Sequence, residues 1–197
     1  NILYQTNLYY VDEDLEGYLK EIANKMEILS PIEKKTDVIF FYDGFGLNSR
    51  GLAQIYIKAL CQIKKVVYIT YEDCKENIPD IQNIINKNDG RILYINRSQK
   101  KYTEQILQLC SFASEFKPHD FFFYSFPNDV VGVTSLNILE GKVTRYQINL
   151  TDHAFWLGAR CIDKCIEFRD YGANVSVKYR GISKNIIAKL PFYPIIN

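Results

Sequence analysis

The sequence has almost no excess charge, few histidines and no long apolar run, and each shortage narrows the possible functions. The formal net charge of the 197 residues is +1, so no electrostatic argument favours a nucleic-acid or other polyanionic partner. No apolar run approaches the roughly 18 residues that cross a membrane. We therefore expect neither a nucleic-acid partner nor a transmembrane segment.

The cysteines are five in number and scattered along the chain. Three residues lie between Cys161 and Cys165. The pair therefore lacks the two-residue spacing of a zinc site, and a second pair of ligands is also missing. We therefore expect reduced thiols, a cytoplasmic protein and no metal site. The sequence also begins without a methionine, so we expect it to be a piece of a longer chain.

From residue 38 onward, short apolar runs alternate with stretches of helical periodicity. The predicted strands are residues 38–42, 66–70, 91–96, 121–124, 143–149 and 162–168, and the segment 186–190 follows the last helix. The predicted helices are residues 49–62, a helix that opens at Pro79, and residues 102–116, 127–139 and 173–180. This alternation predicts a doubly wound α/β domain, Rossmann-like, with a parallel sheet and helices on both faces.

A further amphipathic helix is predicted before the alternating part. Residues 12–29 have acidic residues at the start and apolar residues at helical spacing, and Pro31 follows. We expect residues 1–36 to form an N-terminal helix that packs on the domain, and residues 37–197 to form the Rossmann-like lobe.

Ligands of open α/β sheets bind beyond the carboxyl ends of the strands, so the strand ends are the candidate sites. They are residues 43–51, 71–73, 96–97, 125–129 and 150–158. The loop over residues 43–51 is rich in glycine, but Ser49 stands where a dinucleotide fingerprint needs its third glycine, and the lysine of a P-loop is missing. A phospho-receiver is also disfavoured, because Asp43 has no second acidic residue beside it.

What remains of this loop is a polar segment that leads into a helix N-terminus. Gly46, Asn48, Ser49 and Arg50 are its candidate substrate-binding residues, since free N–H groups at such a terminus meet polar or anionic ligands. Ser49 alone is equally well explained as an N-cap.

His153 is one of only two histidines, and it follows Asp152 at a strand end. A single histidine is most often structural, but an imidazole at a strand end accepts a proton near neutral pH. Asp152 and His153 are therefore the candidate catalytic pair, with Trp156 and Gly158 as candidate substrate contacts. His119 precedes a strand at the opposite edge of the sheet, and we expect it to be structural.

Four segments, in this order, resemble the N-terminal lobe of GT-B glycosyltransferases, with distant similarity to O-GlcNAc transferase and SPINDLY-like proteins. They are Phe45-Gly-Leu-Asn-Ser-Arg-Gly-Leu-Ala-Gln54, Ile148-Asn-Leu-Thr-Asp-His-Ala-Phe-Trp-Leu-Gly158, Cys161-Ile-Asp-Lys-Cys-Ile-Glu-Phe-Arg-Asp170 and Ile186-Ile-Ala-Lys-Leu-Pro-Phe-Tyr-Pro194. The resemblance covers roughly residues 37–194. These relatives carry histidines in the loop after the first strand, whereas this chain has Asn48-Ser49-Arg50 there.

The resemblance implies an acceptor-binding lobe of bacterial type, with sugar transfer that needs no metal or other cofactor. The nucleotide-sugar would be a substrate gripped mainly by a second, C-terminal lobe, which is expected to be missing from this chain, so the fragment alone would be inactive. Another class of function stays open: a non-catalytic Rossmann-like module that binds a small ligand or a protein.

Overall fold

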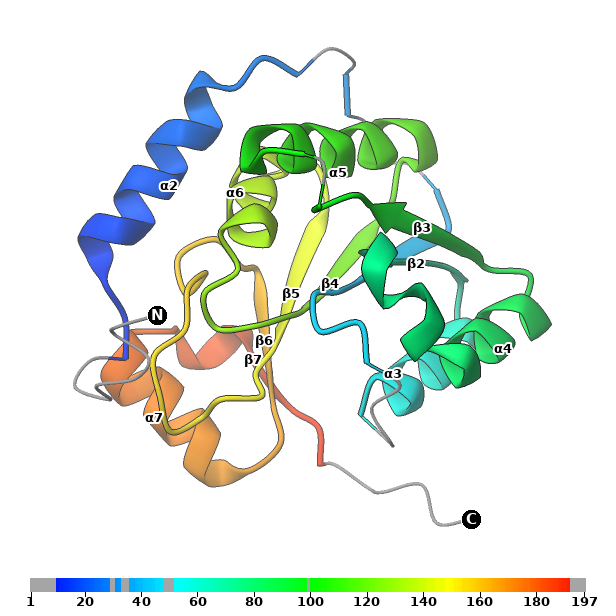
Figure 1. The fold of residues 1–197 in the computed structure, drawn as a ribbon. Coiled ribbons are helices and arrows are strands. Elements are labelled where there is room, and N and C mark those ends of the chain that lie inside the picture. Colours follow the sequence, from blue (N-terminus) through cyan, green and yellow to red (C-terminus); the bar gives the residue numbers. More distant parts are fainter. Residues whose placement is uncertain (1–9, 29–30, 33–35, 48–51, 99, 192–197) are drawn as a thin grey trace.

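A seven-stranded, all-parallel sheet lies between two layers of helices in the computed structural model of the protein (Figure 1). The structure describes residues 10–28, 31–32, 36–47, 52–98 and 100–191. The strands are β1 (Val38–Asp43), β2 (Lys65–Tyr71), β3 (Arg91–Ile95), β4 (Asp120–Tyr124), β5 (Thr144–Ile148), β6 (Lys164–Glu167) and β7 (Ile187–Lys189). The helices are α2 (Glu13–Lys25), α3 (Leu52–Cys61), η1 (Glu72–Asn77), α4 (Pro79–Lys87), α5 (Tyr102–Phe116), α6 (Val130–Ile138), α7 (Asp170–Arg180) and η2 (Lys184–Ile186).

The strand order is β3-β2-β1-β4-β5-β6-β7. The chain builds the sheet outward from β1 to β3, then returns to the other side of β1 and builds outward again from β4. The order therefore reverses between β1 and β4, which is the topological switch point where open α/β sheets bind ligands. The predicted doubly wound α/β fold is confirmed.

Alternate residues of the central strands point to opposite faces of the sheet. Phe40 and Tyr42 of β1 join the core beneath α5 and α6, whereas Ile39 and Phe41 join the core beneath α3 and α4. Both faces of the strand are buried, so β1 is a continuous apolar run without polar alternation. Helix α2 adds an outer layer beside α6 (Figure 1).

Most elements lie where the sequence predicts them, but several boundaries differ; α7, for example, begins at Asp170 and not at residue 173. Helix α6 begins at Val130 and not at residue 127, because Asp129 is its N-cap and accepts a hydrogen bond from the N–H of Gly132 at 2.8 Å. Helix α2 ends at Lys25, and Met26 already has extended backbone angles. These differences of three or four residues are of the size by which sequence patterns misplace helix ends.

Candidate functional site

The loop after β1 is organised by the buried carboxylate of Asp43. Its Oδ1 accepts hydrogen bonds from the backbone N–H groups of Phe45 at 2.9 Å and Gly46 at 3.0 Å, and its Oδ2 accepts one from the Tyr68 hydroxyl at 2.7 Å. Burial raises the pKa of Asp43 to about 6, and these three hydrogen bonds partly oppose the rise. Asp43 therefore serves the loop and is closed to a ligand.

Gly46 of this loop is needed for close packing. A Cβ added at Gly46 would lie 2.4 Å from the Cys74 side chain, and the backbone there has a φ of +57°. Gly46 therefore shapes the first turn of the loop. Asn48, Ser49 and Arg50, the other candidates from this loop, lie outside the described residues.

The crevice at the switch point is filled by the protein's own polar groups. Asp129 Oδ2 accepts hydrogen bonds from the Tyr42 hydroxyl at 2.8 Å and from the Ser125 hydroxyl. Gly44 lies against them, and a Cβ at this position would come within 1.8 Å of the Ser125 oxygen. The space directly between the ends of β1 and β4 is therefore closed to a ligand.

A group of polar side chains beside an open pocket lies beyond the carboxyl ends of β5 and β6, the two strands that follow β4 in the sheet. Asp152 Oδ1 is 3.3 Å from His153 Nδ1, and Asp152 Oδ2 accepts a hydrogen bond of 2.6 Å from Arg169 Nε. Burial opposes ionisation of Asp152, but the hydrogen bonds from Arg169 and His153 outweigh it and lower the pKa of this carboxyl. An ionised carboxylate only accepts, so His153 donates through Nδ1, and in the neutral imidazole this leaves Nε2 as an acceptor.

A pocket of about 480 Å³ at the carboxyl edge of the sheet is bordered by Asp152, His153 and Arg169. The His153 side chain is 63% exposed and that of Asp152 is 13% exposed, so the imidazole is presented outward while its carboxylate partner is covered. Apolar contacts from Leu52, at the start of α3, and from Phe168 complete the lining together with Leu150 and Pro191. An exposed imidazole oriented by a carboxylate is suited to accept a proton from a bound hydroxyl.

The loop that carries His153 is held from beneath by Arg180, whose side chain is fully buried. Its Nη2 donates to the carbonyl oxygens of Thr151 at 2.8 Å and Ala154 at 2.6 Å, which flank the catalytic candidates. Burial lowers the pKa of Arg180 to about 10, so the guanidinium stays charged at neutral pH. Its Cζ lies 5.1 Å from the centre of the Trp156 ring.

The structure thus brings some predicted site residues together and places others in the core. Asp152 and His153 meet in one pocket, whereas Trp156 is 2% exposed and packs against Arg180. Gly158 is also buried, and its N–H donates to Glu16. Neither Trp156 nor Gly158 lines the pocket beside His153 in the described part of the chain.

Arg169 is the site residue that the sequence reasoning missed. It directly follows the strand predicted at residues 162–168, so the strand-end criterion that selected Asp152 would also have selected Arg169. Its hydrogen bond to Asp152 spans 17 positions in the sequence and follows from the pairing of β5 with β6.

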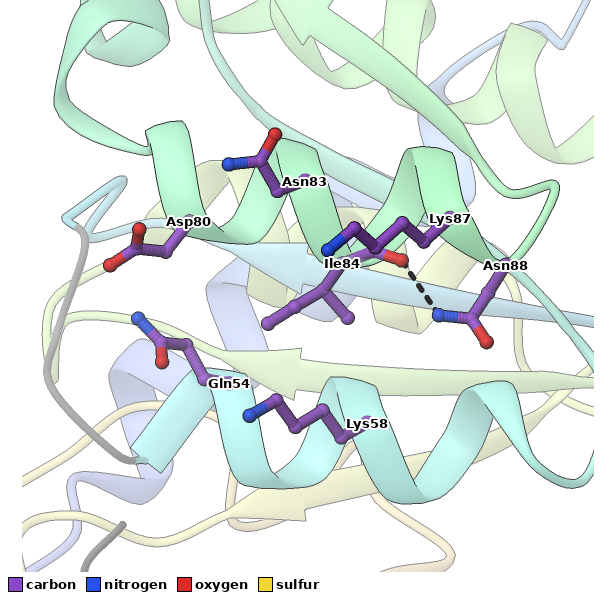
Figure 2. A pocket seen from close by; sticks show the side chains of 7 residues that line it. All are labelled: Gln54, Lys58, Asp80, Asn83, Ile84, Lys87 and Asn88. Carbon is purple, nitrogen blue, oxygen red and sulfur yellow. Dashed lines mark hydrogen bonds between the residues drawn. The ribbon is translucent and has the colours of Figure 1, made fainter. Parts of the chain in front are cut away.

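A separate polar groove runs between α3 and α4 on the outer face of the molecule (Figure 2). Gln54 and Lys58 of α3 face Asp80 and Lys87 of α4 across it (Figure 2). Within the groove, the side-chain amide of Asn88 donates a hydrogen bond of 2.7 Å to the carbonyl oxygen of Ile84 (Figure 2). We assign no ligand to this groove, because solvated lysines on two packed helices are ordinary surface.

Comparison of the chain with models of protein families, with curated proteins and with solved structures finds no match in any of the three. Among the described residues, no helix has the length and apolar character that crossing a membrane requires. In the same part of the chain, no three histidine, cysteine or acidic side chains gather as a metal-ligand group. The fold and the pocket geometry are therefore the basis for assigning a function.

Proposed function

We propose that this chain is the acceptor-binding lobe of a glycosyltransferase that moves a sugar from a nucleotide-sugar to an acceptor hydroxyl. The observation that carries the proposal is the group formed by His153, Asp152 and Arg169 at the carboxyl ends of β5 and β6. The pair Asp152–His153 lies within one of the sequence segments that resemble GT-B enzymes, and the pocket stands at the edge where Rossmann-like sheets bind ligands.

In the proposed reaction, His153 acts as the general base. Its Nε2 takes the proton of the acceptor hydroxyl, and the acceptor oxygen forms a bond to the anomeric carbon of the donor sugar. The bond from that carbon to the diphosphate oxygen breaks, and its electron pair leaves with the nucleoside diphosphate. Asp152 stabilises the imidazolium that forms, so its role is to orient His153 and not to contact the sugar.

Arg169 has two effects in this scheme. Its Nε binds Asp152 at 2.6 Å, which keeps the carboxylate ionised and in place. Its positive charge at the pocket also favours the negative charge that develops on the leaving diphosphate. A second lobe that grips the nucleotide is part of the proposal, and no metal ion or other cofactor is required by it.

The test measures nucleoside diphosphate release by the full-length protein from UDP- and GDP-sugars, with sugars and peptides as acceptors. We expect His153→Ala to lower kcat by about 100-fold or more, because general-base catalysis typically contributes that much. His119→Ala is the matched control, since the His119 side chain is 44% exposed and stands at the opposite edge of the sheet. This control should retain wild-type activity.

Two results would count against the proposal. One is a His153→Ala variant as active as the wild type, which would remove the proposed base. The other is the absence of both binding and turnover of every nucleotide-sugar by the full-length protein. That second result would favour a Rossmann-like module that binds a small ligand or a protein without catalysis.

A further inference from the structure

A second pocket opens at the carboxyl edge, beyond β2, β3 and β4, and it shares no lining residue with the pocket of His153. Its volume is about 390 Å³, which is within the range of small-molecule sites. Its walls come from strand ends, from the first turns of α5 and from the loop that leads into α6. Aromatic and planar polar side chains line it, among them Tyr71, Arg97, Tyr102, Phe126, Asn128 and Asp129.

Two aromatic rings that line this second pocket are exposed to solvent. Tyr102 is 67% exposed and Phe126 is 45% exposed, although burial of such a ring stabilises a protein by about 2 kcal/mol. The Phe126 ring is supported by Phe45, since their centres lie 4.3 Å apart. Exposed rings beside polar groups offer apolar faces on which a ligand stacks.

A chain of hydrogen bonds fixes the donor and acceptor roles of the hydroxyl of Tyr71, a residue that lines this pocket. The Asp129 carboxylate accepts the only hydroxyl proton of Tyr42, at 2.8 Å. The 2.8 Å hydrogen bond between Tyr42 and Tyr71 must therefore take its proton from Tyr71. Burial raises the pKa of Tyr71, so this hydroxyl remains protonated. Tyr71 consequently offers a ligand the lone pair of its oxygen, as an acceptor.

Arg97 and Asn128 supply hydrogen-bond donors to the same pocket. The Arg97 guanidinium lies 4.4 Å from the centre of the Tyr71 ring, and it binds Asp73 through Nε at 2.9 Å and Nη2 at 2.7 Å. Because Asp73 compensates its charge and Asp129 adds a carboxylate, an anionic ligand gains little here. The exposed amide of Asn128 offers a donor and an acceptor.

We propose that this second pocket binds a neutral pyranose sugar. Such a sugar has C–H faces that stack on the rings of Tyr102 and Phe126. Its hydroxyls both donate and accept, so they pair with the acceptor oxygen of Tyr71 and with the donors of Arg97 and Asn128. The binding of this sugar does not rest on the proposed function, because the pocket shares no lining residue with the one that holds His153.

Saturation-transfer difference NMR on the full-length protein tests this site without any nucleotide-sugar. The probes are methyl glucoside, methyl galactoside and methyl N-acetylglucosaminide at millimolar concentration. We expect at least one to receive saturation at its ring protons, and the double variant Tyr102→Ala, Phe126→Ala to weaken its binding roughly tenfold or more. Tyr18→Ala is the matched control, because Tyr18 is 63% exposed on α2, outside the pocket.

Failure to detect any of the three probes overturns the proposal, and so does a double variant that binds as well as the wild type. Both rings are exposed, and a thermal melt by circular dichroism checks that the variant is folded. Should the double variant unfold, Arg97→Gln replaces it, with the same loss of binding expected and unchanged binding as the contrary result.

The outcomes also separate this site from the proposed function. Sugar binding without any transfer activity refutes the transferase and leaves the sugar site standing. Transfer activity without binding of any of the three sugars refutes the sugar site and leaves the transferase standing.

Discussion

The carboxylate of Glu16, on α2, accepts a hydrogen bond of 2.7 Å from the backbone N–H of Gly158, 142 residues further along the chain. The same carboxylate accepts hydrogen bonds from the N–H groups of Ala159 at 3.1 Å and Arg160 at 3.3 Å. Successive N–H groups that converge in this way form an anion-binding concavity, which is filled here by a side chain of the protein. Helix α2 thereby holds the segment that follows the His153 loop.

Replacing Glu16 by alanine should destabilise the protein. Two buried N–H groups and a partly buried third would lose their acceptor, and we expect a decrease of about 3 kcal/mol in the free energy of unfolding. Urea unfolding followed by circular dichroism measures this change. Glu21→Ala is the control, because Glu21 is exposed on the same helix. Similar unfolding free energies for the two variants would contradict a supporting role for α2.

Asp43 should make the stability of the protein depend on pH. Its pKa rises from an ordinary value of 3.8 to about 6 in the folded state, mainly because the carboxyl is buried. Between these two pH values the folded state binds more protons than the unfolded state, so the contribution of Asp43 to stability is lost as the pH rises. The loss should reach about 3 kcal/mol above pH 6.

The variant Asp43→Asn isolates this contribution. An amide keeps an oxygen for the N–H groups of Phe45 and Gly46, and it carries no charge at any pH. We expect the variant to lose the decline in stability between pH 4 and pH 6 that the wild type shows, when urea unfolding is repeated across that range. Asp37→Asn, which changes an exposed carboxylate just before β1, should keep the wild-type slope. A wild-type slope in Asp43→Asn would refute the assignment.

The fold could be predicted because its signals are local. The predicted apolar run 121–124 forms strand β4 with Asp120 added at its start, and the bounds of α5 agree with the predicted residues 102–116. The order of the strands and the position of the switch point could not be predicted, since they depend on pairing between distant segments. The candidate site follows the same division: Asp152 and His153 are neighbours in the chain, whereas Arg169 reaches them through the pairing of β5 with β6.

Trp156 shows that a place after a strand does not by itself identify a ligand contact. A single tryptophan in the segment after a strand resembles a ligand contact, but its place in the core depends on Arg180, which lies beneath the same loop. A buried arginine 24 positions away leaves no periodic signal in the sequence near Trp156. Long-range packing of this kind needs coordinates, and it changes a predicted substrate contact into a residue that packs in the core.

Two glycines that look alike in the sequence should respond to alanine in opposite ways. A Cβ at Gly44 would lie 1.8 Å from the Ser125 hydroxyl and 2.9 Å from Asp129 Oδ2, whereas a Cβ at Gly17, within α2, meets nothing within 4 Å. We expect Gly44→Ala to lower the free energy of unfolding by about 1–3 kcal/mol through overpacking. Gly17→Ala should raise it by about 1 kcal/mol through helix propensity.

Thermal and urea unfolding of both glycine variants measures these differences. Adding Ser125→Gly to Gly44→Ala removes the atom that clashes most closely, so the double variant should lose less stability than the sum of the two single variants. Strict additivity would show that the cost at Gly44 arises elsewhere. The rescue would also establish that the space between the ends of β1 and β4 is closed by packing of Gly44 on Ser125.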